Sequence, residues 1–149
     1  MEISNLVGPV EMQFVIGLGL SLILGYIVGV EREMRHKDAG ISTHIMVIAG
    51  SMLFTLLSSI VDPLSTSRIA SQIVVGIGFL GAGLILKEGV SVKNLTTAAS
   101  VWFAAAIGMA LGFGFYIIAI IAAIVIALVP RIPSLHNDLH KETCVKCSE

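Results

Sequence analysis

Charged residues are scarce in this sequence and nearly missing from its middle. Of 149 residues, 13% are charged and 56% are hydrophobic. Between positions 43 and 129 the charges fall only in short gaps between apolar runs, at Asp62, Arg68, Lys87, Glu88 and Lys93. A soluble domain of this length exposes much of its surface and needs charges spread along the chain. The pattern therefore excludes an ordinary soluble domain and favours a protein in a lipid bilayer.

Three further absences narrow the function. No Lys or Arg precedes Arg32, so we expect no cleavable signal peptide. No Asp, Glu, Lys or Arg lies near the middle of a predicted span, where ion-coupled carriers usually place an ionisable group. No recognisable arrangement of a nucleophile and a general base appears in the sequence, so we expect no enzymatic activity.

Four apolar runs define the predicted helices, at residues 12–30, 43–61, 69–86 and 95–129. The first three are close to the ~20 residues that a helix needs to cross a ~30 Å hydrocarbon core. The fourth has roughly 35 residues, which is too long for one tilted span. The Gly112-Phe113-Gly114 segment near its middle offers a tight turn, so we divide this run into spans 95–111 and 114–129.

The distribution of Lys and Arg predicts the topology. Successive connections carry zero, three, one, two, zero and three basic residues. This alternation fits the positive-inside rule for five spans with the N-terminus outside and the C-terminus in the cytoplasm. We therefore predict an all-α, polytopic membrane protein with five transmembrane helices, in which residues 1–11 are external, 12–129 form the membrane domain and 130–149 are a cytoplasmic tail.

Local signals suggest where helices begin and end. We expect the first helix to continue through Lys37 and to end at Gly40. Residues 65–67 should supply the N-cap of the third helix, and Asn94 that of the fourth.

Small residues recur at four-residue spacing and predict close helix packing. They are Gly17, Ser21, Gly25 and Gly29 in the first span, and Thr96, Ser100, Ala104, Gly108 and Gly112 in the fourth. The third span carries Gly76, Gly78, Gly81 and Gly83. The first three also match the dinucleotide pattern G-x-G-x-x-G, but no strand precedes them, so we expect no nucleotide site. We expect spans one, three and four at the centre and the apolar fifth span at the outside.

Polar residues cluster where the first helix leaves the membrane. Glu31 to Arg35 and Glu33 to Lys37 are i,i+4 pairs in the favourable order. One interpretation is a helix end whose charges pair with one another and extend into the lipid headgroups. The other is a segment in which Glu31 and Arg32 bind other helices or a partner protein.

The second span has a polar face of His44, Ser51, Thr55, Ser58 and Ser59, followed by Asp62. The face could line a water or ion path, but we favour hydroxyls that bond to carbonyls one turn back in the same helix. Gln72 in the third span is expected to bond to a neighbouring helix rather than to a substrate.

The tail contains His136, His140, Cys144 and Cys147. Two His and two Cys are a common ligand set for a structural Zn²⁺ ion, although one straight helix could not place all four around the ion. The alternatives are a Zn²⁺ site and a solvated tail.

Three motifs in order resemble those of the MgtC/SapB family. The first runs from Gly25 and Gly29 through Glu31-Arg32-Glu33, Lys37 and Ala39-Gly40 to Thr43-His44. The second runs from Arg68 through Gln72 to Gly83, and the third from Leu95 through Thr96-Thr97 to Trp102. The resemblance covers roughly residues 12–129, the membrane part of a family whose longer members add an ACT-like domain.

The resemblance implies a bacterial or archaeal plasma-membrane protein linked to growth at low magnesium and, in pathogens, to survival inside host cells. It implies regulation of other membrane proteins, with transport of Mg²⁺ or another ion as the alternative. The signature polar positions are Glu31, Arg32, Lys37, Thr43, Arg68, Gln72, Thr96 and Thr97. We expect the bilayer, a second copy or another membrane protein as partners, with Mg²⁺ transported or sensed, and no nucleic acid.

Overall fold

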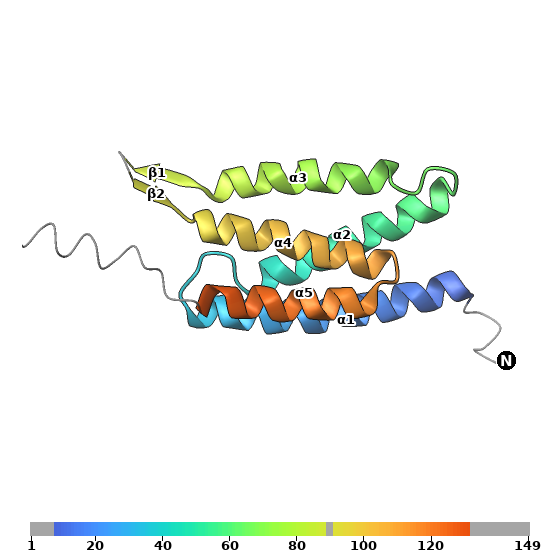
Figure 1. Cartoon of the computed structure of the whole chain (residues 1–149), viewed down its shortest axis with the longest axis horizontal. Helices are drawn as coiled ribbons and strands as arrows, with labels where there is room; N and C mark the ends of the chain where they lie inside the picture. Colours follow the sequence, from blue (N-terminus) through green and yellow to red (C-terminus); the bar gives the residue numbers. More distant parts are fainter. Residues whose placement is uncertain (1–7, 89–90, 132–149) are drawn as a thin grey trace, which may run out of the picture.

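The computed structural model describes residues 8–88 and 91–131, which form a bundle of α-helices with one small hairpin (Figure 1). The helices of this part are α1 (Pro9–Met34), α2 (Ile41–Val61), α3 (Arg68–Leu84), α4 (Leu95–Gly112) and α5 (Tyr116–Leu128). A 3₁₀ turn, η2 (Val129–Arg131), follows α5. The helices lie side by side along the long axis of the molecule.

The hairpin between α3 and α4 was not expected. Strand β1 (Leu86–Glu88) pairs antiparallel with β2 (Ser91–Lys93), with Leu86 opposite Lys93. The described chain is mostly helical, as the all-α prediction requires, and the hairpin is an addition at this connection. Strands of three residues are too short to show a sequence period.

Three of the helices, α1, α2 and α4, are long and apolar enough to cross a membrane. Helices α3 and α5 are also apolar but shorter. Large hydrophobic side chains cover the outward faces of the bundle; on α5 they include Ile117, Ile118, Ile121 and Ile124. A continuous apolar outer surface is costly in water and suits lipid.

The division of the long apolar run is confirmed. Helix α4 ends at Gly112, and Gly114 adopts the left-handed conformation with φ of +80°. The N–H of Phe115 then bonds to the carbonyl of Ala110 at 2.8 Å, which closes the turn before α5. Only glycine adopts this φ without strain, so the glycine lets the chain reverse.

Helices α2 and α4 form the centre of the bundle, and α3 lies at its edge (Figure 1). The expectation that the third span is central is therefore wrong. A Cβ added at Gly108 would lie 2.2 Å from the Ile48 carbonyl oxygen, and one at Gly112 would lie 2.6 Å from that of Met52. The backbones of α2 and α4 are thus in direct contact, and only glycine on α4 permits it.

Helix α1 packs on α2 by the same device. A Cβ at Gly25 would lie 2.7 Å from the Ile45 Cα, and one at Gly29 would lie 2.3 Å from the Ile41 Cα. Helix α5 contacts α4 and α1, and it buries only a narrow stripe that includes Ala119, Ala123 and Ile126.

Helix ends differ from the sequence prediction. Helix α1 ends at Met34, and Gly40 instead precedes the first residue of α2. The Ser67 side chain does not cap α3; the Ser58 hydroxyl of α2 accepts the N–H groups of Ile69 and Ala70, both at 3.2 Å.

Asn94 precedes α4 but does not cap it with its side chain. Its φ is 65°, and its amide donates to the carboxylate of Asp38 in the α1–α2 loop. The first N–H groups of α3 and the side-chain amide of Asn94 are therefore both bonded by side chains from other parts of the fold. Local sequence does not reveal such partners.

Candidate functional site

One end of the bundle gathers the positive charge. The end of α1, the α1–α2 loop, the β1–β2 hairpin, the start of α4 and the end of α5 meet there (Figure 1). All Lys and Arg residues of the described part lie at this end except Arg68. We refer to it as the basic end.

Arg32 is the buried cation of the basic end. The residue is 1% exposed, and its Nη2 donates to the Thr97 hydroxyl of α4 at 3.0 Å. Its Nε is buried with no hydrogen-bond partner among the described residues. Because α1 continues past the apolar run, Arg32 falls on the same helical face as Gly25 and Gly29, which is the face packed against α2.

Glu31 and Arg35 form an ion pair one turn apart on α1. The Arg35 Nε contacts the Oε1 of Glu31, which is 5% exposed. Glu31 Oε2 has no hydrogen-bond partner in the part of the chain that is described. Arg35 also donates from Nη1 to the Pro130 carbonyl at 2.5 Å, and so it ties the end of α1 to the end of α5. The helix end is thus both self-paired and joined to other helices.

Two residues of the polar face of α2, Ser51 and Thr55, lie in the seam with α4, against Gly108 and Gly112. His44 is buried, with Nδ1 2.9 Å from the Gly40 carbonyl, while Nε2 and the Thr55 hydroxyl have no hydrogen-bond partner among residues 8–88 and 91–131. Ser59 bonds within its own helix, to Leu56, but Ser58 donates to the Thr66 carbonyl instead. Where backbones are in contact at Gly108 and Gly112, this seam has no width for a water path.

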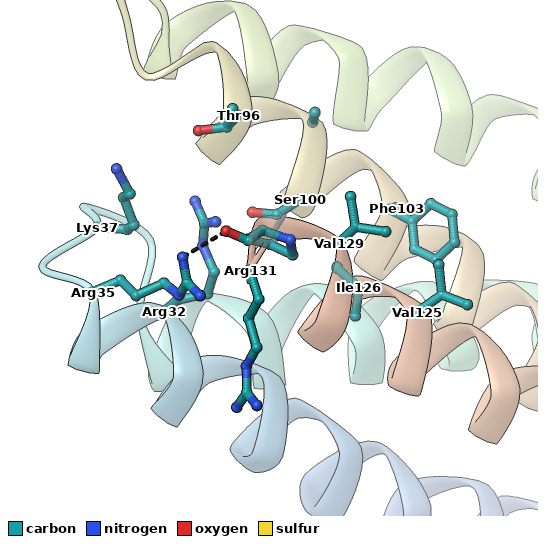
Figure 2. A pocket seen from close by; sticks show the side chains of 12 residues that line it. Arg32, Arg35, Lys37, Thr96, Ser100, Phe103, Val125, Ile126, Val129 and Arg131 are labelled. Carbon is teal, nitrogen blue, oxygen red and sulfur yellow. Dashed lines mark hydrogen bonds between the residues drawn. The ribbon is translucent and has the colours of Figure 1, made fainter. Parts of the chain in front are cut away.

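A cavity of about 680 Å³ opens at the basic end between the end of α1, the start of α4 and the end of α5 (Figure 2). We call it the basic-end pocket. Its polar wall is formed by Arg32, Arg35, Lys37, Thr96, Ser100 and Arg131. Its apolar wall is formed by Ala99, Phe103, Val125, Ile126, Val129 and Pro130.

The structure divides the signature polar residues between the two ends. Glu31, Arg32, Lys37, Thr96 and Thr97 gather at the basic end, and Thr43 is half-buried near the start of α2. Arg68 and Gln72 lie in the first turns of α3, at the opposite end, and both are exposed. The Arg68 guanidinium is 3.7 Å from the Asp62 carboxylate. Within one chain these residues therefore do not form a single site.

The predicted packing residues are also divided. The small residues of α1 and α4 at helix contacts are buried: Gly17, Ser21, Gly25, Gly29, Ser100, Ala104 and Gly108. On α3, a Cβ at Gly81 would touch Ala98 at 3.9 Å, whereas one at Gly76, Gly78 or Gly83 would meet nothing within 4 Å. Contacts through these three glycines could come only from outside the described part of the chain.

The tail residues His136, His140, Cys144 and Cys147 lie outside the described residues. Within residues 8–88 and 91–131, no three His, Cys, Asp or Glu side chains gather as a metal site would require. The Zn²⁺ site stays a prediction.

Sequence reasoning did not single out Arg35 and Arg131 as members of one site. Arg35 stands three residues after Arg32 and therefore on the same side of a helix. Arg131 comes just after the fifth span. The predicted topology brings the end of the fifth span to the end of the first, and so it could have placed Arg131 near Arg32.

Known proteins place this chain in a family. The sequence profile of the MgtC family matches residues 18–137. Protein MgtC of Salmonella typhimurium strain LT2 is 43% identical over 113 residues, which is 76% of this chain and 49% of that protein. Protein MgtC of Brucella abortus strain 2308 is 44% identical over 110 residues, or 73% and 46% of the two chains.

The alignments thus span about half the length of these relatives. No solved structure matched the chain. The match to the family profile covers most of the sequence, includes the residues of the basic end, and agrees with the apolar helices of a membrane protein. This chain belongs to the MgtC family.

Proposed function

We propose that this protein is a non-enzymatic regulator of the plasma membrane that acts by binding the transmembrane helices of other membrane proteins. The observation that carries the proposal is the open face of α3. Helix α3 buries only Ala70, Ile73, Ile77 and Gly81 and leaves the rest of its circumference without a neighbour in the described chain.

The open face of α3 has the composition of a helix-packing surface. Gln72, Gly76 and Gly83 follow one another at spacings of one and two helical turns, and all are exposed. In α1 and α4, glycines at such spacing bring helix backbones into contact. Lipid does not drive helices together, so small residues and interhelical amide bonds supply most of the attraction. The exposed glycines and Gln72 of α3 could pack in the same way against a helix from another chain.

Five crossings fit the arrangement of the helices. Helices α2 and α4 both run away from the basic end, so the chain between them must return to it, and α3 spans that distance (Figure 1). Helix α5 likewise returns the chain to the basic end. If α2 and α4 cross the membrane, α3 and α5 cross it too. Helix α3 would cover roughly 25 Å at 1.5 Å per residue, which suits a slightly thinned bilayer.

The distribution of charges favours one orientation of this bundle in the membrane. Lys and Arg are retained on the cytoplasmic side of bacterial membranes, so the basic end would face the cytoplasm and the start of α1 the outside. The location at the plasma membrane of a bacterium or archaeon, and the link to magnesium limitation, follow from the family resemblance and belong to this proposal.

Transport of Mg²⁺ is the alternative, and three features of the described part weigh against it. Polar groups of the α2 face lie in a seam with backbone contacts, and no Asp or Glu lies near the middle of a helix. The basic-end pocket is lined by four cationic side chains, which repel a divalent cation.

The test measures binding and flux on the same purified protein. We expect no flux of Mg²⁺, protons or K⁺ above empty liposomes, and we expect a membrane protein to co-purify with the chain in mild detergent. Flux that is present in the wild type and lost in Glu31→Ala would overturn the proposal. A monomer that co-purifies with nothing would also contradict it.

A further inference from the structure

We propose that the basic-end pocket is a binding site for an anionic phospholipid, with the phosphate at the polar wall and an acyl chain along α4 and α5. The site requires a bilayer around the bundle but not the regulatory role. Failure of one proposal therefore leaves the other standing.

The polar wall carries a concentrated positive charge. Arg32, Arg35 and Lys37 line one side of the cavity, and Figure 2 shows them grouped below and to the left of Thr96 at the start of α4. Among the acidic residues nearby, Glu31 is paired with Arg35, Glu33 accepts the N–H of Ile41, and Asp38 accepts the Asn94 amide. Arg32 donates a hydrogen bond to the Thr97 hydroxyl, and this bond holds the buried guanidinium in the wall of the pocket. A phosphate is the natural counterion for such a cluster.

Several donors remain free to contact a phosphate. Arg35 uses Nε for Glu31 and one Nη1 hydrogen for Pro130, which leaves its Nη2 hydrogens available. Lys37 and Thr96 are exposed and make no hydrogen bond to a side chain within the described residues. The donors come from α1, from the loop and from α4, so the fold brings them together.

The other wall distinguishes a lipid from a free phosphate. Phe103, Val125, Ile126 and Val129 extend from the cationic side along α4 and α5 (Figure 2). An inorganic ion would leave this surface empty, whereas an acyl chain would cover it. Basic pockets between helices on the cytoplasmic side commonly hold anionic headgroups. The volume of about 680 Å³ accommodates a headgroup and the first part of a chain.

The experiment titrates phosphatidylglycerol into the full-length protein in a neutral detergent and counts bound lipid by native mass spectrometry. The variant is Lys37→Gln, because Lys37 is an exposed loop residue whose loss leaves the helix contacts intact. The matched control is Arg68→Gln, which removes one exposed charge at the opposite end.

We expect one phosphatidylglycerol per chain in the wild type and in Arg68→Gln, with affinity about fivefold lower in Lys37→Gln. Adding Thr96→Val should lower it further. Phosphatidylcholine and millimolar inorganic phosphate should not displace the lipid. Equal binding of phosphatidylcholine, displacement by inorganic phosphate, or an equal loss in Arg68→Gln would overturn the proposal.

Discussion

At the scale of single residues, the surroundings of Arg32 explain why two neighbouring threonines have different roles. Thr97 is buried and accepts the hydrogen bond from Arg32, whereas Thr96 is exposed at the pocket. Both were marked by the family resemblance, and the sequence alone could not separate them. The difference depends on which side of α4 faces α1, a matter of tertiary packing.

The two threonines therefore supply a matched pair of variants. Thr97→Val removes the hydroxyl that accepts from the buried guanidinium, which leaves a charged donor unsatisfied. We expect the free energy of unfolding to fall by about 1–3 kcal/mol, as measured by helical signal during SDS titration. Thr96→Val should change it by less than about 0.5 kcal/mol. Equal effects would contradict the assigned hydrogen bond.

A second pair of variants tests backbone contact between α1 and α2. Gly29→Ala places a Cβ 2.3 Å from the Ile41 Cα, so the two helices must separate. We expect a loss of about 1–3 kcal/mol in the same SDS titration. The control is Gly50→Ala on α2, where an added Cβ meets nothing within 4 Å and should be tolerated. If Gly29→Ala is as stable as the control, the α1–α2 contact is wrong.

At the scale of elements, the sequence predicted the helices well and their ends poorly. Apolar runs near the length of a bilayer located the helices, and the Gly-Phe-Gly segment located the break between α4 and α5. The cap of α3 was missed because Ser58 lies in α2 and reaches α3 only after the helices pack. The position of α3 at the edge was missed because glycine stripes predict a contact without saying whether the partner lies in the same chain.

The cap from Ser58 leads to a prediction about α3. Its hydroxyl donates to the Thr66 carbonyl and accepts two N–H groups at the start of α3. Ser58→Ala should destabilise the protein by about 1–2 kcal/mol and speed hydrogen exchange at Ile69 and Ala70. Ser59→Ala removes a bond within α2 only, and it should leave exchange in α3 unchanged. Faster exchange in both variants would argue against the cap.

At the scale of the whole molecule, the proposed topology can be tested with impermeant thiol reagents. In a background of Cys144→Ser and Cys147→Ser, Leu64→Cys places a fully exposed thiol in the α2–α3 connection. It should react in intact cells because that connection is predicted to be outside. Lys37→Cys, at the basic end, should react only after the membrane is permeabilised. The reverse pattern would invert the topology.

The central claim is that α3 binds a helix from another chain. It is tested most directly by replacing the exposed glycines of α3 with a large side chain, which would block close packing. The measurement compares the proteins that co-purify in mild detergent with the wild type, with Gly76→Leu/Gly83→Leu and with Gly19→Leu/Gly50→Leu. All four glycines have open space beside them in the described chain, so each pair should fold.

The account predicts that the complex survives in the wild type and the control pair and is lost in the α3 pair. Identification of the co-purified chain then distinguishes a second copy from another membrane protein. A complex that survives Gly76→Leu/Gly83→Leu unchanged would contradict the account.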